Sequence, residues 1–256
     1  KMEWVEKAVK VTRWLGKDYK FFVQTTSTQD EAKILVKTGA KSGLLVVADE
    51  QTKGRGRFGR SWFSPPNSNI YFTIALQLPP DHPHLTTLPL LVGVAVAEAM
   101  REMGINVFVK WANDVVFDGK KLAGILTESE SNWVFIGVGI NVNLTENDLP
   151  DDLKGTATSM RIVTGKTFDR SEVLAAILVS LERWWEVWAK GNLSEFWSMW
   201  ERFDALKGKQ VSVAMPDGTK LEGVADGVSE DGSLKLKLQN ESTLNLVAGD
   251  VTVRVR

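Results

Sequence analysis

The chain has 256 residues, of which 43% are hydrophobic, so it can bury the core of one large domain or of a large and a small one. Lysine and arginine total 31 against 32 aspartate and glutamate, and this formal net charge of -1 excludes a global positive field for a long nucleic acid. The absence of cysteine excludes disulfides, thiolate zinc sites and cysteine nucleophiles. No stretch reaches the roughly 18 apolar residues of a membrane span, and the charged N-terminal residues lack a signal-peptide core, so we expect a cytoplasmic protein without a membrane partner.

The first half of the chain alternates between predicted helices and strands. Apolar residues three to four apart predict helices at residues 2–14, 28–38 and 85–103. Runs of β-branched and aromatic residues predict strands at residues 21–24, 44–49, 69–78, 107–110, 121–128 and 133–143. The close spacing of the last three strands indicates an α+β fold with a mixed, largely antiparallel sheet and flanking helices.

The second half begins with two more predicted helices. Asp169 and Glu172 are spaced as a capping box that opens a helix over 170–190, and a shorter helix is predicted over 194–203. The tryptophans of the longer helix follow helical spacing, which favours a core or interface position over a cofactor-stacking box.

The chain changes character near residue 207. Five short strands separated by Asp-Gly and Gly-Asp turns are predicted after this point. About fifty residues of this kind are typical of a small SH3-like β-barrel. We therefore predict two domains, with residues 1–207 forming the α+β domain and residues 208–256 forming the barrel.

The strongest local signal is Lys-Gly-Arg-Gly-Arg-Phe-Gly-Arg-Ser-Trp at residues 53–62, with four cations, three glycines and no acid. A solvated basic turn is the simplest alternative. The glycines permit close backbone approach, the amides of such a loop can cradle an anion, and arginines add forked donors suited to phosphate or carboxylate. The loop lacks the Lys-Ser or Lys-Thr of a P-loop and does not open a helix, so it predicts anion capture by another geometry.

A second cluster, Lys-Trp-Ala-Asn-Asp at residues 110–114, ends one predicted strand, and Lys121 begins the next. Alone, this pattern is equally typical of a surface hairpin whose Asn113 and Asp114 satisfy their own backbone. The strand after Lys121 is apolar, however, and its burial would project the ammonium from the rim into a pocket, where it can neutralise a carboxylate and a phosphate. Gly-Val-Gly-Ile-Asn at 137–141 adds two small positions for a close ligand, a weak signal by itself.

Together with Thr-Ser-Thr-Gln at 26–29, these clusters resemble the biotin protein ligase family, in its short class without an N-terminal DNA-binding domain. The family pattern combines a Ser-Thr-Asn/Gln turn, a Gln-x-x-Gly-Arg-Gly-Arg-x-x-Arg-x-Trp loop, a Lys-Trp-Pro-Asn-Asp turn followed by a lysine, and a Gly-x-Gly-x-Asn strand. The resemblance covers residues 20–256 and implies a catalytic domain of the class II aminoacyl-tRNA synthetase type over 1–207, with the barrel as a further family feature. Ala112 departs from the usual proline, which makes the turn less stiff.

The resemblance implies a role for individual residues. Biotin contacts are implied for Ser27, Thr28, Gln29, Gln51, Gly54, Arg55, Gly56, Arg57, Trp62 and Lys121. ATP contacts are implied for Arg57, Arg60, Lys110, Trp111, Asn113 and Asn141. Lys121 and Arg57 are the implied catalytic residues, and Asp114 is the predicted contact for Mg²⁺ on the phosphates.

The implied reaction joins two anions. The carboxylate of biotin attacks the α-phosphate of ATP, and Arg57, Lys110 and Lys121 together with Mg²⁺ screen the repulsion, so catalysis is mainly positioning and electrostatics. The mixed anhydride hydrolyses in water, which explains a loop that admits ligands and then excludes solvent. A lysine of the biotin carboxyl carrier domain of a carboxylase then attacks the acyl carbon and releases AMP.

Three other functions fit parts of the pattern. A lipoate or octanoate transferase or ligase of the same fold would lack the Arg-rich loop, and a pure binding module would hold biotin or a nucleotide without turnover. The bifunctional repressor form of the ligase carries a winged-helix domain of about 60 residues before the Ser-Thr turn. Only 26 residues precede Ser27 and the charge offers no basic stripe, so no DNA binding is expected. Members of the short class are often dimers, so the resemblance leaves a homodimer open, while the sequence itself does not define the oligomeric state.

Overall fold

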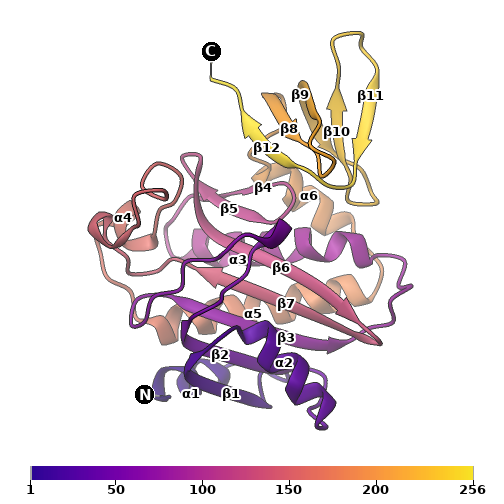
Figure 1. Ribbon diagram of the computed structural model, residues 1–256. Helices are drawn as coiled ribbons and strands as arrows, with labels where there is room; N and C mark the ends of the chain where they lie inside the picture. Colours follow the sequence, from indigo (N-terminus) through magenta and orange to yellow (C-terminus); the bar gives the residue numbers. More distant parts are fainter. Residues whose placement is uncertain (1, 256) are drawn as a thin grey trace.

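The computed structural model describes residues 2–255, which are built around one seven-stranded sheet (Figure 1). Neighbouring strands follow the order β1-β2-β3-β7-β6-β5-β4. Within the described residues β1 and β2 run parallel and the other pairs are antiparallel, which confirms the predicted mixed, largely antiparallel sheet. The strands are β1 (Tyr19–Thr25), β2 (Leu44–Gln51), β3 (Ile70–Gln77), β4 (Phe108–Lys110), β5 (Asp114–Phe117), β6 (Lys120–Glu130) and β7 (Trp133–Ile140).

Helices cover both faces of this sheet. The helices of one layer are α1 (Glu3–Val9), α3 (Leu88–Glu102), α5 (Arg170–Ala189) and α6 (Ser194–Phe203), and Figure 1 shows α3 and α5 behind the sheet. On β2, Leu45 and Val47 belong to the core formed with these helices. Leu44 and Val46 instead pack in a second cluster with Ala32 of α2 (Thr28–Lys37). Successive strand side chains point to opposite faces, so β2 is apolar throughout because both of its faces are covered.

The N-terminal helix is shorter than predicted, because α1 ends at Val9 rather than at residue 14. The backbone N–H groups of Arg13, Trp14 and Leu15 donate to the buried carboxylate of Glu182 on α5, at 2.9 Å each for the shortest bonds. This carboxylate offers the amides partners outside a helix. A residue 169 positions later along the chain therefore decides the local conformation.

Other differences from the sequence prediction concern short elements and caps. The strand β5 was not predicted, although it pairs with β4 in a tight hairpin whose register joins Lys110 to Asp114. The short helix α4 (Met160–Thr164) was also not predicted. Asp169 caps α5 as expected, but its side chain accepts the N–H of Ser171 rather than forming the predicted capping box. The tryptophans of α5 pack against the core, as helical spacing predicted, with Trp184 and Trp188 fully buried and Trp185 partly buried.

The C-terminal residues form the predicted five short strands, paired as an antiparallel sheet in the order β11-β10-β9-β8-β12. These strands are β8 (Gln210–Ala214), β9 (Lys220–Val228), β10 (Leu234–Lys237), β11 (Thr243–Leu246) and β12 (Asp250–Val253). The indole N–H of Trp111 donates to the carbonyl of Gly232 at 2.9 Å, and the Thr86 hydroxyl donates to the carbonyl of Asp231 at 2.6 Å. The β9–β10 turn therefore docks directly on the first part of the chain.

The predicted boundary near residue 207 falls between α6 and β8. The division of the chain into two domains stays a prediction, since the core continues from the large sheet into β8 to β12. None of the helices among residues 2–255 combines the length and the apolar character needed to cross a membrane.

Candidate active site

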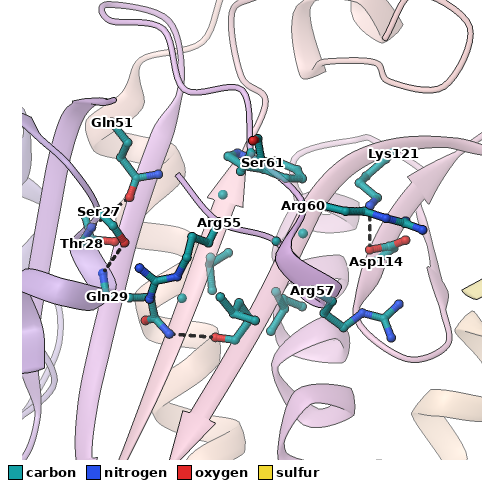
Figure 2. A pocket seen from close by; sticks show the side chains of 18 of the residues that line it. Ser27, Thr28, Gln29, Gln51, Arg55, Arg57, Arg60, Ser61, Asp114 and Lys121 are labelled. Atoms are coloured by element: carbon teal, nitrogen blue, oxygen red, sulfur yellow. Dashed lines mark hydrogen bonds and ion pairs between the residues drawn. The ribbon is translucent and has the colours of Figure 1, made fainter. Parts of the chain in front are cut away.

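A pocket opens on the face of the sheet that carries α2, beneath the loop of residues 53–62 (Figure 2). The loop connects β2 to β3 and brings its side chains over β6 and β7. The predicted site residues that line this pocket are Ser27, Thr28, Gln29, Gln51, Arg55, Gly56, Arg57, Arg60, Trp62, Asp114 and Lys121. The fold thus brings together segments that lie far apart in the sequence.

One end of the pocket is built from neutral polar groups at the start of α2. Ser27 is the N-cap of this helix, and its hydroxyl accepts the N–H of Gln29 at 3.2 Å, as the Ser-Thr-Gln turn predicted. The side chain of Gln51 accepts the N–H of Thr28 at 2.9 Å and donates to the Ser64 hydroxyl at 3.1 Å. These bonds orient uncharged donors and acceptors at the start of α2.

The side chain of Gln29 is held in the pocket wall from both ends of its amide. Its oxygen accepts the Thr73 hydroxyl at 2.7 Å, and its nitrogen donates to the Glu128 carboxylate at 2.9 Å. Thr73 also shares a 2.8 Å hydrogen bond with the Thr28 hydroxyl. A Cβ at Gly137 would lie 3.0 Å from the Gln29 side chain, so this glycine gives the amide its place against β7.

The covering loop closes on itself as a small hairpin. Gly56 donates to the carbonyl of Arg60 and Trp62 donates to the carbonyl of Gly54, both at 2.8 Å, around a short 3-10 turn at residues 57–59. These two amides bond within the loop and shape its turn, whereas anion capture by the loop stays a prediction. The arginine side chains are the donors that the loop presents outward.

Arg55 ties the first half of the loop to the protein. Its guanidinium donates to both carboxylate oxygens of Asp30 on α2, at 2.8 and 2.9 Å, and to Glu128 on β6 at 3.1 Å. Arg55 also lines the pocket, and its direct contact with a ligand stays a prediction. Because forked, charge-assisted bonds are directional, the three bonds hold the Gly-Arg-Gly segment against α2 and β6.

The second half of the loop contacts the C-terminal sheet. Arg60 forms an ion pair with Asp250 at the start of β12, and Arg57 donates to the carbonyl of Gly249 at 3.4 Å. Partial burial raises the pKa of Asp250, but the hydrogen bond and the charge of Arg60 outweigh it and hold that pKa below its usual value. Burial lowers the pKa of Arg57, although a guanidinium remains charged at neutral pH.

The indole of Trp62 lies across two neighbouring strands of the sheet. Gly124 of β6 pairs with Gly139 of β7, and the indole covers both of them. A Cβ at Gly139 would lie 2.3 Å from the indole nitrogen, and one at Gly124 would lie 2.7 Å from the six-membered ring. Of the two small positions predicted for a close ligand, Gly139 thus lies beneath the Trp62 ring, and Gly124 adds a second one that was not predicted. The ring fastens the end of the loop to the floor of the pocket.

The other end of the pocket carries several cations and two carboxylates. The ammonium of Lys121 lies 3.3 Å from the Asp114 carboxylate, as Figure 2 shows. Burial lowers the pKa of Lys110, and the charges of Asp114 and Asp250 only partly offset this effect. Among residues 2–255 no group of three or more His, Cys, Asp or Glu side chains is placed to hold a metal ion. Asp114 is therefore a single carboxylate facing an ammonium.

Five predicted site residues do not line this pocket: Gly54, Lys110, Trp111, Asn113 and Asn141. The Asn113 amide donates to the carbonyl of Ile125 at 2.8 Å, and the Asn141 amide donates to the carbonyl of Thr158 at 3.1 Å. Both side chains are buried, and both tie the ends of strands to neighbouring segments. Their contacts with a nucleotide stay predictions.

The structure adds pocket residues that the motifs did not reveal. These are Ser61, Phe72, Ile125, Leu126, Val138 and Asp250. The apolar ones lie within strands, where they look like any core residue. Asp250 reaches the pocket from 190 residues beyond its partner Arg60, so no local pattern could identify it.

The fold and the pocket define a class of protein. Figure 2 shows Ser27, Thr28 and Gln51 on one side and Lys121 with its cationic neighbours on the other. Such a site suits a small organic acid with a neutral polar head, whose carboxylate meets a phosphate among the cations. These features are those of a ligase that activates an organic acid before transferring it.

Known proteins narrow this class. Residues 21–143 match the biotin/lipoate A/B protein ligase family, and residues 207–254 match the biotin protein ligase C terminal domain. The chain is 35% identical to the bifunctional ligase/repressor BirA of Bacillus subtilis, over 94% of this chain and 75% of the relative. It is 30% identical to the biotin–[acetyl-CoA-carboxylase] ligase of Mycobacterium tuberculosis, over 89% and 86%.

A solved structure agrees with these relatives. The biotin protein ligase from Aquifex aeolicus in complex with biotin and ATP superimposes with a TM-score of 0.82 at 32% identity, covering 93% of this chain and 99% of that one. The chain belongs to the biotin protein ligase family.

Proposed function

We propose that this protein is an ATP-dependent biotin protein ligase, which converts biotin and ATP to biotinyl-5'-AMP and transfers biotin to a lysine of a carrier domain. The observation that carries the proposal is the two-ended pocket beneath the Gly-Arg loop, in a chain of the biotin protein ligase family. The relative from Aquifex aeolicus is described in complex with both biotin and ATP, which supports these two substrates.

Biotin would bind with its ureido ring at the neutral end of the pocket. That ring offers both donors and acceptors, and the Ser27 and Thr28 hydroxyls with the Gln51 side chain present complementary groups there. The predicted biotin contacts Gln29, Arg55, Gly56 and Trp62 surround this end, but the bonds of Arg55 to carboxylates suggest an anchoring role for it. The biotin carboxylate would then point toward Lys121.

ATP would bind at the cationic end. There Lys121 would leave Asp114 to approach the biotin carboxylate and the α-phosphate, and Arg57, Arg60 and Lys110 would add positive charge around them. The carboxylate oxygen attacks the α-phosphorus and pyrophosphate leaves, so the cations lower the barrier by screening like charges. Mg²⁺ usually binds one or two carboxylates together with substrate phosphates, and the single carboxylate of Asp114 fits that donor set. It would supply further charge on the phosphates.

The transfer step requires a nucleophile from another protein. A carrier lysine attacks the acyl carbon of the mixed anhydride, and AMP leaves. The relative from Mycobacterium tuberculosis is named as a ligase for acetyl-CoA carboxylase, so we propose the biotin carboxyl carrier domain of such a carboxylase as the acceptor. The alternative, a lipoate or octanoate ligase or transferase, is disfavoured because the named relatives are biotin ligases. The homodimer, the cytoplasmic location and the absence of DNA binding stay predictions.

Incubation of the protein with biotin, ATP, Mg²⁺ and a purified carrier domain tests the proposal. A mass increase of the carrier by one biotinyl group, with release of pyrophosphate, is the expected result. Lys121→Ala should abolish adenylate formation, whereas Lys120→Ala, the next residue but outside the pocket, should leave it unchanged. Transfer of octanoate or lipoate instead of biotin, or no release of pyrophosphate, would refute the ligase function.

A further inference from the structure

We propose that Glu128 of β6 is a positioning residue that couples the biotin end of the pocket to the covering loop, a role that rests on the proposed ligase function. One of its carboxylate oxygens accepts two hydrogen bonds, from the Gln29 amide at 2.9 Å and from the Arg55 guanidinium at 3.1 Å. The ammonium of Lys33 lies 3.5 Å from the same oxygen. A single atom therefore joins the pocket wall to the loop.

The guanidinium of Arg55 is occupied by protein carboxylates. One of its terminal nitrogens donates to both oxygens of Asp30, and the other donates to Glu128. The side chains of these three residues are 34%, 44% and 32% exposed, so water weakens the ion pairs enough for them to break and reform. Arg55 is thus a reversible anchor for the loop, as a cover that admits and retains ligands requires.

The bond between Gln29 and Glu128 makes this anchor sensitive to the pocket. The Gln29 amide is held by the Thr73 hydroxyl at one end and by Glu128 at the other, and it belongs to the hydrogen-bonded wall beside Thr28. A ligand that bonds to this wall changes the strength of the hydrogen bond from Gln29 to Glu128. It thereby affects the bond of Arg55, which donates to the same Glu128 oxygen. By thermodynamic reciprocity, seating the loop on Glu128 strengthens ligand binding to the same degree.

The chain provides a matched control on the same strand. Glu130 lies two residues after Glu128 on the same side of β6, and its carboxylate pairs with Lys33 at 4.0 Å and Lys37 at 3.4 Å. No bond joins it to Arg55 or to Gln29 among the described residues. Glu130→Gln therefore removes one negative charge from the same edge of the sheet without touching the loop anchor.

Limited trypsin digestion of the whole protein measures the anchor directly, because the loop at 53–60 carries four tryptic sites. Glu128→Gln keeps the acceptor oxygen but removes the charge, so cleavage of the ligand-free loop should be about fivefold faster than in the wild type. The KM for biotin should rise about fivefold, with kcat at saturating biotin unchanged. Glu130→Gln should match the wild type in both measurements.

A double-mutant cycle with Arg55→Lys tests whether the two residues act through each other. The effects of Glu128→Gln and Arg55→Lys on loop cleavage should combine to less than their product, since each breaks the same contact. Asp30→Asn removes charge from the other carboxylate that Arg55 binds, so it should also accelerate loop cleavage. This variant replaces Glu128→Gln in the test if Glu128→Gln lowers the urea midpoint, that is, if it destabilises the fold. Glu128→Gln that equals Glu130→Gln in loop cleavage and in the KM for biotin would overturn the proposal.

The digestion needs no turnover, so the two proposals fail separately. A wild type that does not biotinylate the carrier refutes the ligase function. A faster loop cleavage in Glu128→Gln would still support the anchor in that case. A wild type that biotinylates the carrier, together with a Glu128→Gln variant indistinguishable from Glu130→Gln, refutes the positioning role alone.

Discussion

Gly139→Ala should expel the Trp62 indole from the floor of the pocket and loosen the covering loop. The added Cβ would lie 2.3 Å from the indole nitrogen and 2.6 and 3.0 Å from its two neighbouring ring carbons. Ordinary contacts between such atoms are about 3.5 Å, so the ring must retreat by roughly 1 Å. It has no room to tilt toward β6, because it already rests on the backbone of Gly124.

The stability effect follows from overpacking. Forcing a methyl group into a filled site typically costs about 1–3 kcal/mol, which lowers the Tm of a chain of this size by about 2–12 °C. Gly155→Ala is the control, because a Cβ at this exposed position meets nothing within 4 Å. Thermal unfolding should also be measured for Gly124→Ala and for the double variant. The second alanine should lower the Tm little further, because the first one has already displaced the Trp62 indole.

The functional effect should appear in the loop. The KM for ATP should rise and tryptic cleavage within residues 53–60 should accelerate, because Trp62 anchors the end of the loop. The smaller ring of Trp62→Phe should partly restore the Tm of Gly139→Ala. A Gly139→Ala protein with the same Tm as Gly155→Ala and the same loop cleavage as the wild type would refute the reasoning.

Three further predictions address charge. Glu182→Ala should lower the free energy of unfolding, measured by chemical denaturation, by about 3 kcal/mol. The substitution leaves the N–H groups of Arg13, Trp14 and Leu15 without their carboxylate partner. Glu186→Ala, nearer the surface, should lower the free energy of unfolding by less. Burial raises the pKa of Glu182 but these N–H bonds lower it further, so its contribution is present above about pH 4.3 and should fade as the pH falls. Because burial lowers the pKa of Lys110, its ammonium should lose its proton at a lower pH than an ordinary lysine does. The KM for ATP should therefore increase as the pH is raised toward the ordinary lysine pKa of about 10.4, and Lys110→Arg should abolish this increase. Substitution of the loop arginine at 57 by alanine should release biotin adenylate that labels bystander proteins, and unchanged labelling would contradict its role in retention.

Local patterns identified the elements whose cause is local. The apolar run of β2, the Ser27 cap of α2 and the Asp-Gly turns of the C-terminal sheet follow from neighbouring residues, and all were predicted. The strand β5 was not predicted because its four residues directly follow a turn and are too few to show the alternation of apolar and polar residues that marks a strand. The end of α1 was not predicted because the distant carboxylate of Glu182 supplies the partners of the amides beyond it.

The sequence by itself indicated the class of fold and most of the strands, because their patterns are local, and the family resemblance of its motifs indicated most of the segments that meet at the pocket. The tertiary structure decided what each side chain does there. Arg55 binds Asp30 and Glu128, Gly124 and Gly139 receive Trp62, and the loop reaches Asp250 on β12. These pairings join residues far apart along the chain, and only the packed sheet brings their atoms within bonding distance.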